Sequence, residues 1–578
     1  MIERTEYPRP QLRRDAWLPL NGIWEFAFDD KNKGIAKGYD TGKVALPLRI
    51  NVPFSYQYEA SGIGEKAMHE QVWYRRTFSA PAGKRALLCF NGSDYVTDVW
   101  LNGRHALTHT GGFAPFSADV TQYLVNGENT IVVRCIDRDD PTHPRGKQSW
   151  TGKPFGCWYV PNTGIWQSVW IDWVGEDCIA DCLLLPDYDR CSVSGEIVTL
   201  RGAADEAEME ISYRGKGVKC VRFALDGRHT RYCVKLMEQD FVDPVYAWTP
   251  EQPNLFDVVL RLYKGGECTD EAHTRFGLRK ISVEAGQVLL NNAPLYQRLI
   301  LDQGYWQESG LTPPSAQALK KDIELAKAMG FNGARKHQKF EDPYFYYYAE
   351  ELGFLTWCEM PSAYNFCMDE MDALEGEWYE IVRAARNFTS VVCYVPLNES
   401  WGVRNIVAVP EQQDFARAMY YGTKARDASR PISTNDGWES PETTDILGIH
   451  DYAYDSSAFA QKYRPEAYDT VYPARRRLMA FGCKYAGQPV LLTEFGGIAM
   501  ANEATDGNWG YNSGARSDEE FYTRYENLMQ GIHAHAGFQG FCYTQLTDVQ
   551  QEVNGLLDAL HAPKFDLARI ARATRGDR

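Results

Sequence analysis

Two glutamates, each at the end of a short apolar run, are the residues of this chain best placed for chemistry. Residues 395–402 read Val-Pro-Leu-Asn-Glu-Ser-Trp-Gly around Glu399, and residues 490–497 read Val-Leu-Leu-Thr-Glu-Phe-Gly-Gly around Glu494. Such runs are typical of buried parallel strands, and α/β folds carry their chemistry at the carboxyl ends of those strands. Hydrolysis of a glycosidic bond needs two converging carboxyl groups, one to protonate the leaving oxygen and one to attack or stabilise the anomeric carbon.

A structural role is the alternative for each glutamate, because a strand-end carboxylate often serves as an ion-pair partner or a helix cap. Asn398 stands directly before Glu399, and a Gly-Gly pair follows one residue after Glu494. These neighbours indicate polar positioning and close approach of the backbone. The pair taken together therefore favours the catalytic interpretation.

Length and composition exclude several classes of protein. A chain of 578 residues is too long for one core and predicts three or four domains. The net charge of -16 is spread along the chain, which disfavours nucleic acid or an anionic membrane as a partner. No apolar run approaches the length of a membrane span, and the N-terminus lacks the apolar core of a signal peptide. The 14 scattered cysteines include no Cys-x-x-Cys, which fits reduced thiols, and we expect a cytoplasmic protein.

The first half of the chain has the sequence pattern of β-strands joined by turns. Up to about residue 175, alternating or apolar runs are separated by Asn-Gly turn dipeptides at 21–22, 91–92 and 102–103. This pattern predicts a jelly-roll-like β-sandwich over 1–175. Short strands continue through 176–280 and predict a second sandwich, similar to an immunoglobulin domain.

After residue 281 helical and buried-strand patterns alternate. Residues 316–329 repeat apolar side chains at helical spacing, 331–335 follow as a strand, and the alternation continues to 540–544. About 300 residues of such units predict a parallel sheet and suit a closed (β/α)8 TIM barrel over 281–578. An open doubly wound sheet is the alternative, but no Gly-x-Gly-x-x-Gly follows a first strand.

The order of sandwich, immunoglobulin-like domain and barrel resembles glycoside hydrolase family 2, which contains β-galactosidases, β-glucuronidases and β-mannosidases. The resemblance covers nearly the whole chain. In the first domain it rests on Leu-Asn-Gly-Ile-Trp-Glu-Phe at 20–26, Trp-Leu-Asn-Gly at 100–103 and Gly-Ile-Trp-Gln at 164–167. In the barrel it rests on Asn398-Glu399, similar to the acid/base dipeptide of the family, and on Thr-Glu-Phe-Gly at 493–496, similar to its nucleophile motif.

The resemblance implies roles for four residues. Glu399 would be the general acid and then the general base, and burial and the charge of Glu494 should raise its pKa. Glu494 would stay ionised and attack the anomeric carbon, which requires the two carboxyl groups to lie about 5–5.5 Å apart. Asn398 would bind the sugar 2-hydroxyl, and Tyr452 would orient the nucleophile through its hydroxyl.

Three further residues near these motifs are candidate sugar contacts. His450 and Asp451 end the strand that carries Tyr452, and each could contact sugar hydroxyls. Trp401, two residues after Glu399, is the best candidate for stacking on a pyranose ring. A structural histidine at 450 is the alternative.

The chain departs from the family pattern at residues 335–339. Relatives carry an Arg-x-Ser-His-like element, whereas this chain reads Arg335-Lys336-His337-Gln338-Lys339. Arg335 matches the family arginine. The added cations predict a rim that binds a substrate carboxylate. A solvated basic turn paired with Glu341 and Asp342 is the alternative.

Two other segments bear on the sugar and on metals. Where β-glucuronidases carry Asn-x-Lys for the glucuronate carboxylate, this chain reads Glu-Val-Asn at 552–554, which argues against that sugar. The loop 144–150 of the first domain could reach the barrel, as in relatives, or be a plain surface loop. Some relatives use magnesium, but the usual histidine is missing here, so we expect no metal and no cofactor.

We therefore predict a retaining exo-β-glycosidase that removes one terminal sugar from a small glycoside or oligosaccharide. The basic run favours a β-hexuronide such as a β-galacturonide, and a neutral β-galactoside is the nearest alternative. A non-catalytic carbohydrate-binding protein is the alternative of another class. A homo-oligomer is possible, because large relatives often assemble through their β domains.

Overall fold

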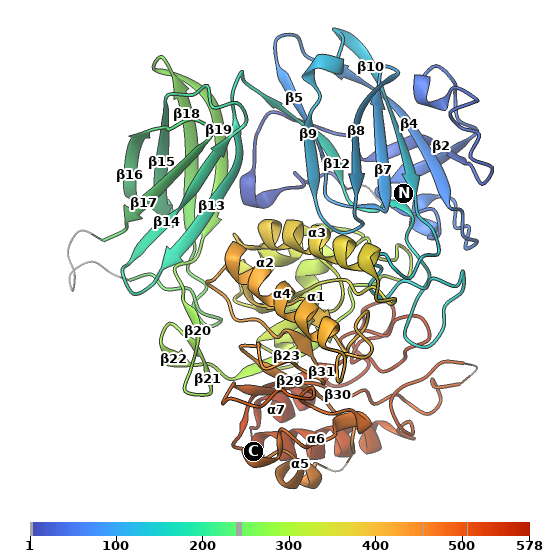
Figure 1. Ribbon diagram of the computed structural model, residues 1–578, viewed down its shortest axis with the longest axis vertical. Coiled ribbons are helices and arrows are strands. Elements are labelled where there is room, and N and C mark those ends of the chain that lie inside the picture. The colour runs from blue at the N-terminus through green and yellow to red at the C-terminus, as the bar shows by residue number, and fades with distance from the viewer. Residues whose placement is uncertain (1–3, 238–244, 455, 506, 578) are drawn as a thin grey trace.

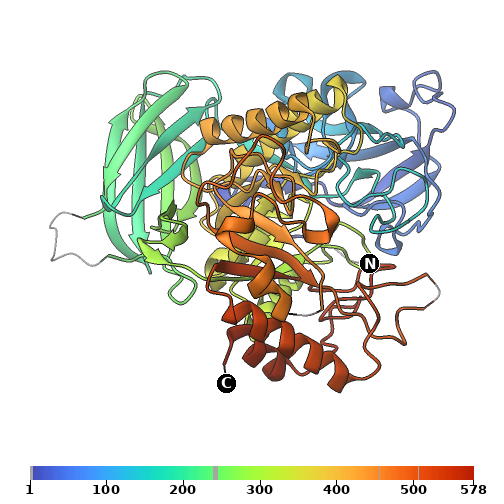
Figure 2. The same cartoon turned by 60° about the horizontal axis from the view of Figure 1, so that its bottom comes forward.

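The computed structural model describes residues 4–237, 245–454, 456–505 and 507–577. The chain forms two β-sandwiches followed by an α/β barrel. Figures 1 and 2 show the two sandwiches side by side on one side of the barrel, and helices α5 to α7 on its other side. In the part of the chain that is described, no helix is both long and apolar enough to cross a membrane.

The first sandwich packs a six-stranded antiparallel sheet against a four-stranded one. The sheets have the orders β3-β2-β4-β10-β7-β8 and β1-β12-β5-β9, and β6 pairs with β11. The Asn102-Gly103 turn joins β7 to β8 with φ of 52° and 76°, the left-handed values that favour this dipeptide. The strands are β1 Trp17–Pro19, β2 Gly22–Phe28, β3 Leu48–Val52, β4 Gln71–Ala80, β5 Arg85–Phe90, β6 Ser93–Asp94, β7 Val96–Leu101, β8 Arg104–Thr110, β9 Phe116–Asp119, β10 Gly127–Ile136, β11 Gly164–Ile165 and β12 Val169–Val174.

The second sandwich is smaller and consists of the sheets β13-β14-β17 and β16-β15-β18-β19. Buried and exposed residues alternate along β17 because one face of each sheet packs on the core. A three-stranded meander, β20-β21-β22, then leads into the barrel. The strands are β13 Ile179–Asp187, β14 Ser192–Thr199, β15 Glu206–Tyr213, β16 Lys216–Ala224, β17 His229–Lys235, β18 Phe256–Lys264, β19 Glu267–Phe276, β20 Ile281–Glu284, β21 Gln287–Leu290 and β22 Ala293–Pro294.

Parallel strands form the barrel in the order β26-β25-β24-β23-β31-β30-β29, with β27 and β28 as a parallel pair beside them. β28 lies next to β29, where the His450 N–H donates to the Gly437 carbonyl at 3.2 Å. The strands are β23 Gln297–Asp302, β24 Gly333–Lys336, β25 Leu355–Glu359, β26 Val391–Val395, β27 Leu397–Asn398, β28 Asn435–Asp436, β29 Leu447–His450, β30 Val490–Gly496 and β31 Phe538–Thr544.

Seven helices accompany these strands in the described ranges. The first begins at the cap Ser315, whose hydroxyl accepts the Ala318 N–H, and it buries Leu319, Ile323 and Ala326 at the predicted spacing. The helices are α1 Ala316–Ala328, α2 Pro343–Leu352, α3 Met368–Ala385, α4 Pro410–Arg426, α5 Ser457–Lys462, α6 Asp518–Ala534 and α7 Leu567–Arg575.

The predicted fold class is confirmed, with one irregularity in the barrel. Residues 437–446, all of them described, connect β28 to β29 without a helix. The eightfold alternation of strand and helix is therefore incomplete at this connection, although the parallel sheet continues through it.

The connection between β10 and β11 leaves the first sandwich and packs on the carboxyl ends of the barrel strands. The Arg145 N–H donates to the Ser362 carbonyl at 2.9 Å, and the Tyr159 hydroxyl donates to the Glu552 carboxylate. Buried Asp137 pairs with Arg145 at 2.9 Å and fixes the loop from within. This loop is therefore part of the barrel mouth and not a plain surface loop.

Candidate active site

Polar side chains from six barrel strands meet at the carboxyl ends of those strands. This is the edge where parallel barrels place their chemistry. Buried contacts join them into one network. The residues are Arg335 on β24, Glu359 on β25, Asn398 on β27, Asp436 on β28, His450 on β29 and Glu494 on β30.

Arg335 is the centre of this network and is fully buried. Its guanidinium donates to Glu359 at 2.9 Å, to Glu494 at 3.0 Å and to the Asn398 side-chain oxygen at 2.5 Å. A planar guanidinium with several fixed donors can hold three acceptors in one orientation. Arg335 thus positions the nucleophile candidate and Asn398 rather than facing solvent.

Both oxygens of Glu494 are held by donors. Arg335 donates to one oxygen, and the Tyr452 hydroxyl donates to the other at 2.6 Å. The Tyr452 ring stacks on Tyr511 with centroids 3.4 Å apart and planes 2° from parallel, which fixes the phenol. The structure therefore places Tyr452 where the family resemblance implied.

Glu399 projects from a tight turn after β27. Glu399 and Ser400 have φ of 51° and 58°, in the left-handed region that costs free energy for residues other than glycine. The Glu399 N–H donates to the Asp436 carbonyl and the Trp401 N–H to the Asn398 carbonyl, both at 2.9 Å. The Trp401 indole N–H donates to the Glu399 carboxylate at 3.2 Å. The turn thus aims the Glu399 side chain away from its strand and toward Glu494.

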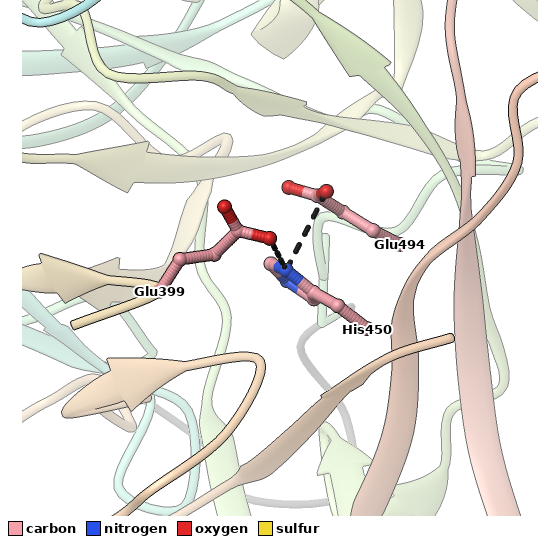
Figure 3. A group of neighbouring side chains, drawn as sticks. All are labelled: Glu399, His450 and Glu494. Carbon is pink, nitrogen blue, oxygen red and sulfur yellow. Dashed lines mark hydrogen bonds and ion pairs between the residues drawn. The ribbon is translucent and has the colours of Figure 1, made fainter. Parts of the chain in front are cut away.

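His450 lies between the two glutamates, as Figure 3 shows. Its Nδ1 is 2.8 Å from Glu399 and 3.4 Å from Glu494, and its Nε2 is 3.0 Å from Asp436. Burial alone would lower the pKa of His450, but the charges of Glu494, Asp436 and Glu399 outweigh it and raise this pKa to about 10. His450 is therefore an imidazolium, and it carries the positive charge between the carboxylates.

This cation changes the pKa of Glu399 in the direction opposite to the one expected from the sequence. Burial favours a raised pKa, but the hydrogen bond and charge of His450, with smaller contributions from Lys147 and Arg335, lower the pKa of Glu399. The prediction that burial and Glu494 would raise it is wrong for the site without substrate, because the prediction did not include the imidazolium.

The two carboxyl groups are close together. One oxygen of each glutamate and one nitrogen of His450 lie within 4.8 Å of one another. The same three atoms could hold a metal ion by distance alone. An imidazolium that donates from both nitrogens has no lone pair to offer a metal, so the contacts of His450 favour a bound proton there.

Replacing His450 by asparagine should move the alkaline limit of activity to higher pH. The variant loses the cation that lowers the pKa of Glu399, so burial then raises that pKa and the acid stays protonated to higher pH. The pH profile of kcat/KM for an aryl β-glycoside measures this. His105→Asn, at an exposed position of β8, is the matched control and should leave the profile unchanged. An alkaline limit that stays in place would contradict this role of His450.

Two lysines of the basic run do not line the site. Lys336 pairs with Asp302 at 2.9 Å and with Glu341 at 2.7 Å, and Lys339 pairs with Glu341 at 2.8 Å. Lys339 also donates to the Gly304 and Leu311 carbonyls, and both lysines are 1% exposed. The prediction of a carboxylate-binding rim is wrong for this pair, because internal carboxylates already hold both ammonium groups.

Lys336→Met should destabilise the barrel rather than change sugar preference. Removing one partner of a buried ion pair leaves charges uncompensated and costs about 3–5 kcal/mol. The midpoint of thermal unfolding, measured by calorimetry, should fall clearly. Lys321→Met, on the exposed face of α1, should change stability by less than about 0.5 kcal/mol. An unchanged midpoint together with a selective loss of uronide hydrolysis would restore the rim prediction.

His337 and Asp451 have internal roles. His337 Nδ1 lies 3.1 Å from Glu359, and burial with the charges of Arg335 and Lys147 holds its pKa well below the usual range, so it is neutral. The Asp451 carboxylate binds Lys462 at 2.6 Å and caps the Ala453 N–H at 3.0 Å. These contacts fix the loop after β29, and the contact of Asp451 with sugar hydroxyls stays a prediction.

Trp401 belongs to an aromatic wall beside Glu399. Its ring meets Trp158 at 5.0 Å and Tyr364 at 5.6 Å, both edge-on, and Tyr364 stacks on Trp150 at 4.2 Å. Trp150 and Trp158 come from the sandwich loop, so two parts of the chain build this wall. A platform of this kind suits a sugar ring or an aromatic leaving group.

Some residues of the site were not predicted. Glu359 and Asp436 end β25 and β28, so the strand-end rule that found the two glutamates could have found them as well. Buried Gln338 has a side-chain nitrogen without a partner among the described residues. Lys147 had no strand-end signal, because a loop of another domain carries it.

Comparison with known families agrees with this architecture. Residues 18–152 match the sugar-binding domain of the glycosyl hydrolases of family 2, and residues 184–279 match a second model of the same family. A β-glucuronidase of Paenibacillus borealis is 24% identical over 99% of this chain and 98% of its own length. A β-galactosidase of Thermoanaerobacter pseudethanolicus is 25% identical over 75% of this chain, and the chain spans only 56% of that relative's length.

Solved structures show the same fold along the whole chain. The β-glucuronidase of Ruminococcus gnavus superposes with a TM-score of 0.78 at 19% identity, covering 98% of this chain and 99% of the other. The β-galacturonidase of Eisenbergiella tayi bound to galacturonate gives 0.76 at 18% identity, covering 100% and 99%. With both family models matched in order and a family relative aligned along nearly the whole chain, the chain belongs to glycoside hydrolase family 2.

Proposed function

We propose that this protein is a retaining exo-β-glycosidase that removes a terminal β-hexuronide, such as a β-galacturonide, from a small glycoside. The observation that carries the proposal is the Glu399–Glu494 pair, with one oxygen of each within 4.8 Å of the same His450 nitrogen. This spacing suits direct attack by one carboxylate. Inverting enzymes hold their two carboxyl groups roughly 6.5–9.5 Å apart to admit a water between them.

In the first step, Glu494 attacks the anomeric carbon while Glu399 gives its proton to the leaving oxygen. The bond to the aglycone breaks as the bond to the Glu494 carboxylate forms, which yields a glycosyl-enzyme and a free alcohol. Arg335 and Tyr452 hold the attacking carboxylate in one orientation. Asn398 keeps a side-chain nitrogen without a partner in the described structure, and this N–H is free to donate to the 2-hydroxyl oxygen.

In the second step, Glu399 acts as a base. It takes a proton from water as the water oxygen attacks the anomeric carbon, and Glu494 leaves as a carboxylate. The lowered pKa of Glu399 beside His450 suits this base. For the first step, entry of the sugar between the glutamates has to weaken the Glu399–His450 contact, so that Glu399 is protonated when substrate binds.

The choice of a hexuronide rests on the sugar acids bound by proteins of similar fold and on the residues at 552–554. Structures of similar fold are described with galacturonate or with D-glucuronic acid bound. The stretch 552–554 reads Glu-Val-Asn and contains no basic residue. Its polar side chains have internal partners, because Glu552 accepts from Tyr159 and Asn554 accepts from Gln545 at 2.7 Å. That argues against the glucuronidase mode of carboxylate binding and favours another route to a sugar acid.

A neutral β-galactoside is the second candidate. Curated β-galactosidases are among the relatives. Lys336 and Lys339 pair with internal carboxylates and so do not favour a substrate carboxylate. The test is a panel of 4-nitrophenyl β-glycosides: galacturonide, glucuronide, galactoside, glucoside, mannoside and fucoside. We expect the highest kcat/KM for a uronide. A neutral glycoside preferred over both uronides would overturn the hexuronide proposal and leave the double-displacement mechanism intact.

A further inference from the structure

Lys147 is a buried cation in the loop between β10 and β11 that the mechanism does not use. Its residue is only 7% exposed. Among the described residues no carboxylate oxygen lies within 4.0 Å of its ammonium group. Buried charges in proteins are normally paired, because an isolated one carries a large desolvation cost. Within the described residues, the ammonium group of Lys147 therefore has no carboxylate at ion-pair distance.

Contacts place Lys147 on the catalytic side of the loop. Its ammonium group lies 5.9 Å from the centroid of Trp158, which packs on Trp401, the residue that donates to Glu399. The positive charge of Lys147 contributes to the lowered pKa of Glu399 and to that of His337, which follows β24 directly. Lys147 thus lies beside the aromatic wall and within electrostatic reach of Glu399 and His337.

The nearest acidic groups are already engaged. Glu552 accepts from the Tyr159 hydroxyl, and burial raises its pKa despite the charge of Lys147. Burial also raises the pKa of the Cys157 thiol beside Lys147, to about 11, so the thiol is neutral. Cys157 is thus a neutral hydrogen-bond partner of Lys147, and Glu552 has no carboxylate oxygen within 4.0 Å of the ammonium group.

The loop holds Lys147 rigidly. The Tyr159 N–H donates to the Lys147 carbonyl at 2.8 Å, and the Tyr364 hydroxyl donates to the Gly146 carbonyl. At Gly146, φ is 58° and a Cβ atom would come within 2.4 Å of the Gln338 carbonyl, so only glycine allows this approach. The loop therefore passes close to Gln338 at the residue before Lys147, and the side-chain nitrogen of Gln338 has no partner among the described residues.

From this geometry we infer that Lys147 is the residue that binds the carboxylate of the terminal sugar, with the side-chain amide of Gln338 as a second donor. The inference rests on the proposed function and adds a specificity residue from the sandwich domain to a site otherwise built by the barrel. A sugar carboxylate would supply the missing partner of the buried ammonium group. A neutral sugar would leave that charge unpaired, which disfavours its binding.

The test compares Lys147→Met with wild-type protein on 4-nitrophenyl β-galacturonide and 4-nitrophenyl β-galactoside. The two substrates share their aglycone and differ only at C6. We expect kcat/KM for the uronide to fall roughly 10- to 100-fold, as for loss of a hydrogen bond to a charged group, and that for the galactoside to change little. Lys147→Arg, which keeps the charge, should retain most of the uronide activity.

Two controls separate binding from folding. Lys153→Met changes an exposed lysine of the same loop. Its kcat/KM for each substrate should stay within about twofold of the wild-type value. Calorimetric titration with free galacturonate should show weaker binding to Lys147→Met and unchanged binding to Lys153→Met. Thermal unfolding of each variant shows whether the fold is intact.

The outcomes distinguish this inference from the proposed function. If the wild type prefers the uronide but Lys147→Met lowers kcat/KM equally for both substrates, Lys147 has a structural role and only the inference fails. If wild type cleaves the galactoside and no uronide, the hexuronide proposal fails and the carboxylate role of Lys147 falls with it.

Discussion

Glu494→Gln should lower kcat by roughly 10⁴-fold or more on every glycoside that the wild type cleaves, because the amide cannot form the glycosyl-enzyme. The shape of the side chain is kept, so the loss reports chemistry rather than packing. One oxygen of Glu494 accepts from Arg335 and the other from Tyr452. A glutamine amide satisfies only one of these donors, so some loss of thermal stability should accompany the loss of activity.

A direct observation of the covalent step would complete this test. A 2-deoxy-2-fluoro uronide with a good leaving group slows the second step, and mass spectrometry of wild-type peptides should find the sugar on Glu494. Proton NMR of early product should show the β-anomer first. An α-anomer as first product, or a label on another residue, would contradict the nucleophile assignment.

Glu399→Gln should show a loss that depends on the leaving group. Substrates with poor leaving groups need proton donation and should lose roughly 10²- to 10⁴-fold, whereas a dinitrophenyl glycoside should still form the glycosyl-enzyme. Hydrolysis of that intermediate then becomes slow, because no base activates the water. The measurement is steady-state and burst kinetics with a series of aryl glycosides.

Azide should rescue this variant. A small anion needs no general base and can occupy the space left by the carboxylate, so it should attack the glycosyl-enzyme and give a β-glycosyl azide. The Trp401 indole, which donates to Glu399 in the wild type, can donate to the glutamine oxygen and keep the turn in place. Equal losses for good and poor leaving groups, with no rescue, would show that Glu399 is not the acid/base.

The sequence predicted the framework of this site well where the signal is local. Glu399, Glu494 and Asn398 follow apolar runs, and this pattern places them at the carboxyl ends of parallel strands whatever the details of packing. The structure brings all three together. Tyr452 followed from the family resemblance, and its contact with Glu494 agrees with it.

The errors arose where the sequence shows charge but not the direction of the side chain. Residues 335–339 carry three basic side chains in a row of five, and successive residues of a strand point to opposite faces. Arg335 points into the barrel mouth, whereas Lys336 pairs with Asp302 and Glu341 behind it. The partners of Lys336 lie 34 residues before it and five residues after it, so its pairing depended on tertiary contacts.

The state of the acid was also decided by tertiary structure. Paired carboxyl groups alone suggest a raised pKa for one of them. The fold instead inserts His450 between the pair and backs it with Asp436, and the imidazolium lowers the pKa of Glu399. No spacing in the sequence indicates that a histidine 51 residues after Glu399 touches it.

By itself, the sequence determined the class of fold and the two carboxyl groups that define the chemistry, because apolar periodicity and strand ends are local properties. Tertiary structure alone decided which cations are paired with internal carboxylates. It buried Lys336 and Lys339 against internal carboxylates, whereas Lys147, from a loop of the first sandwich, has no carboxylate at ion-pair distance among the described residues. Charge recognition depends on which groups remain unpaired after folding, and that is a property of the packed chain rather than of any segment of it.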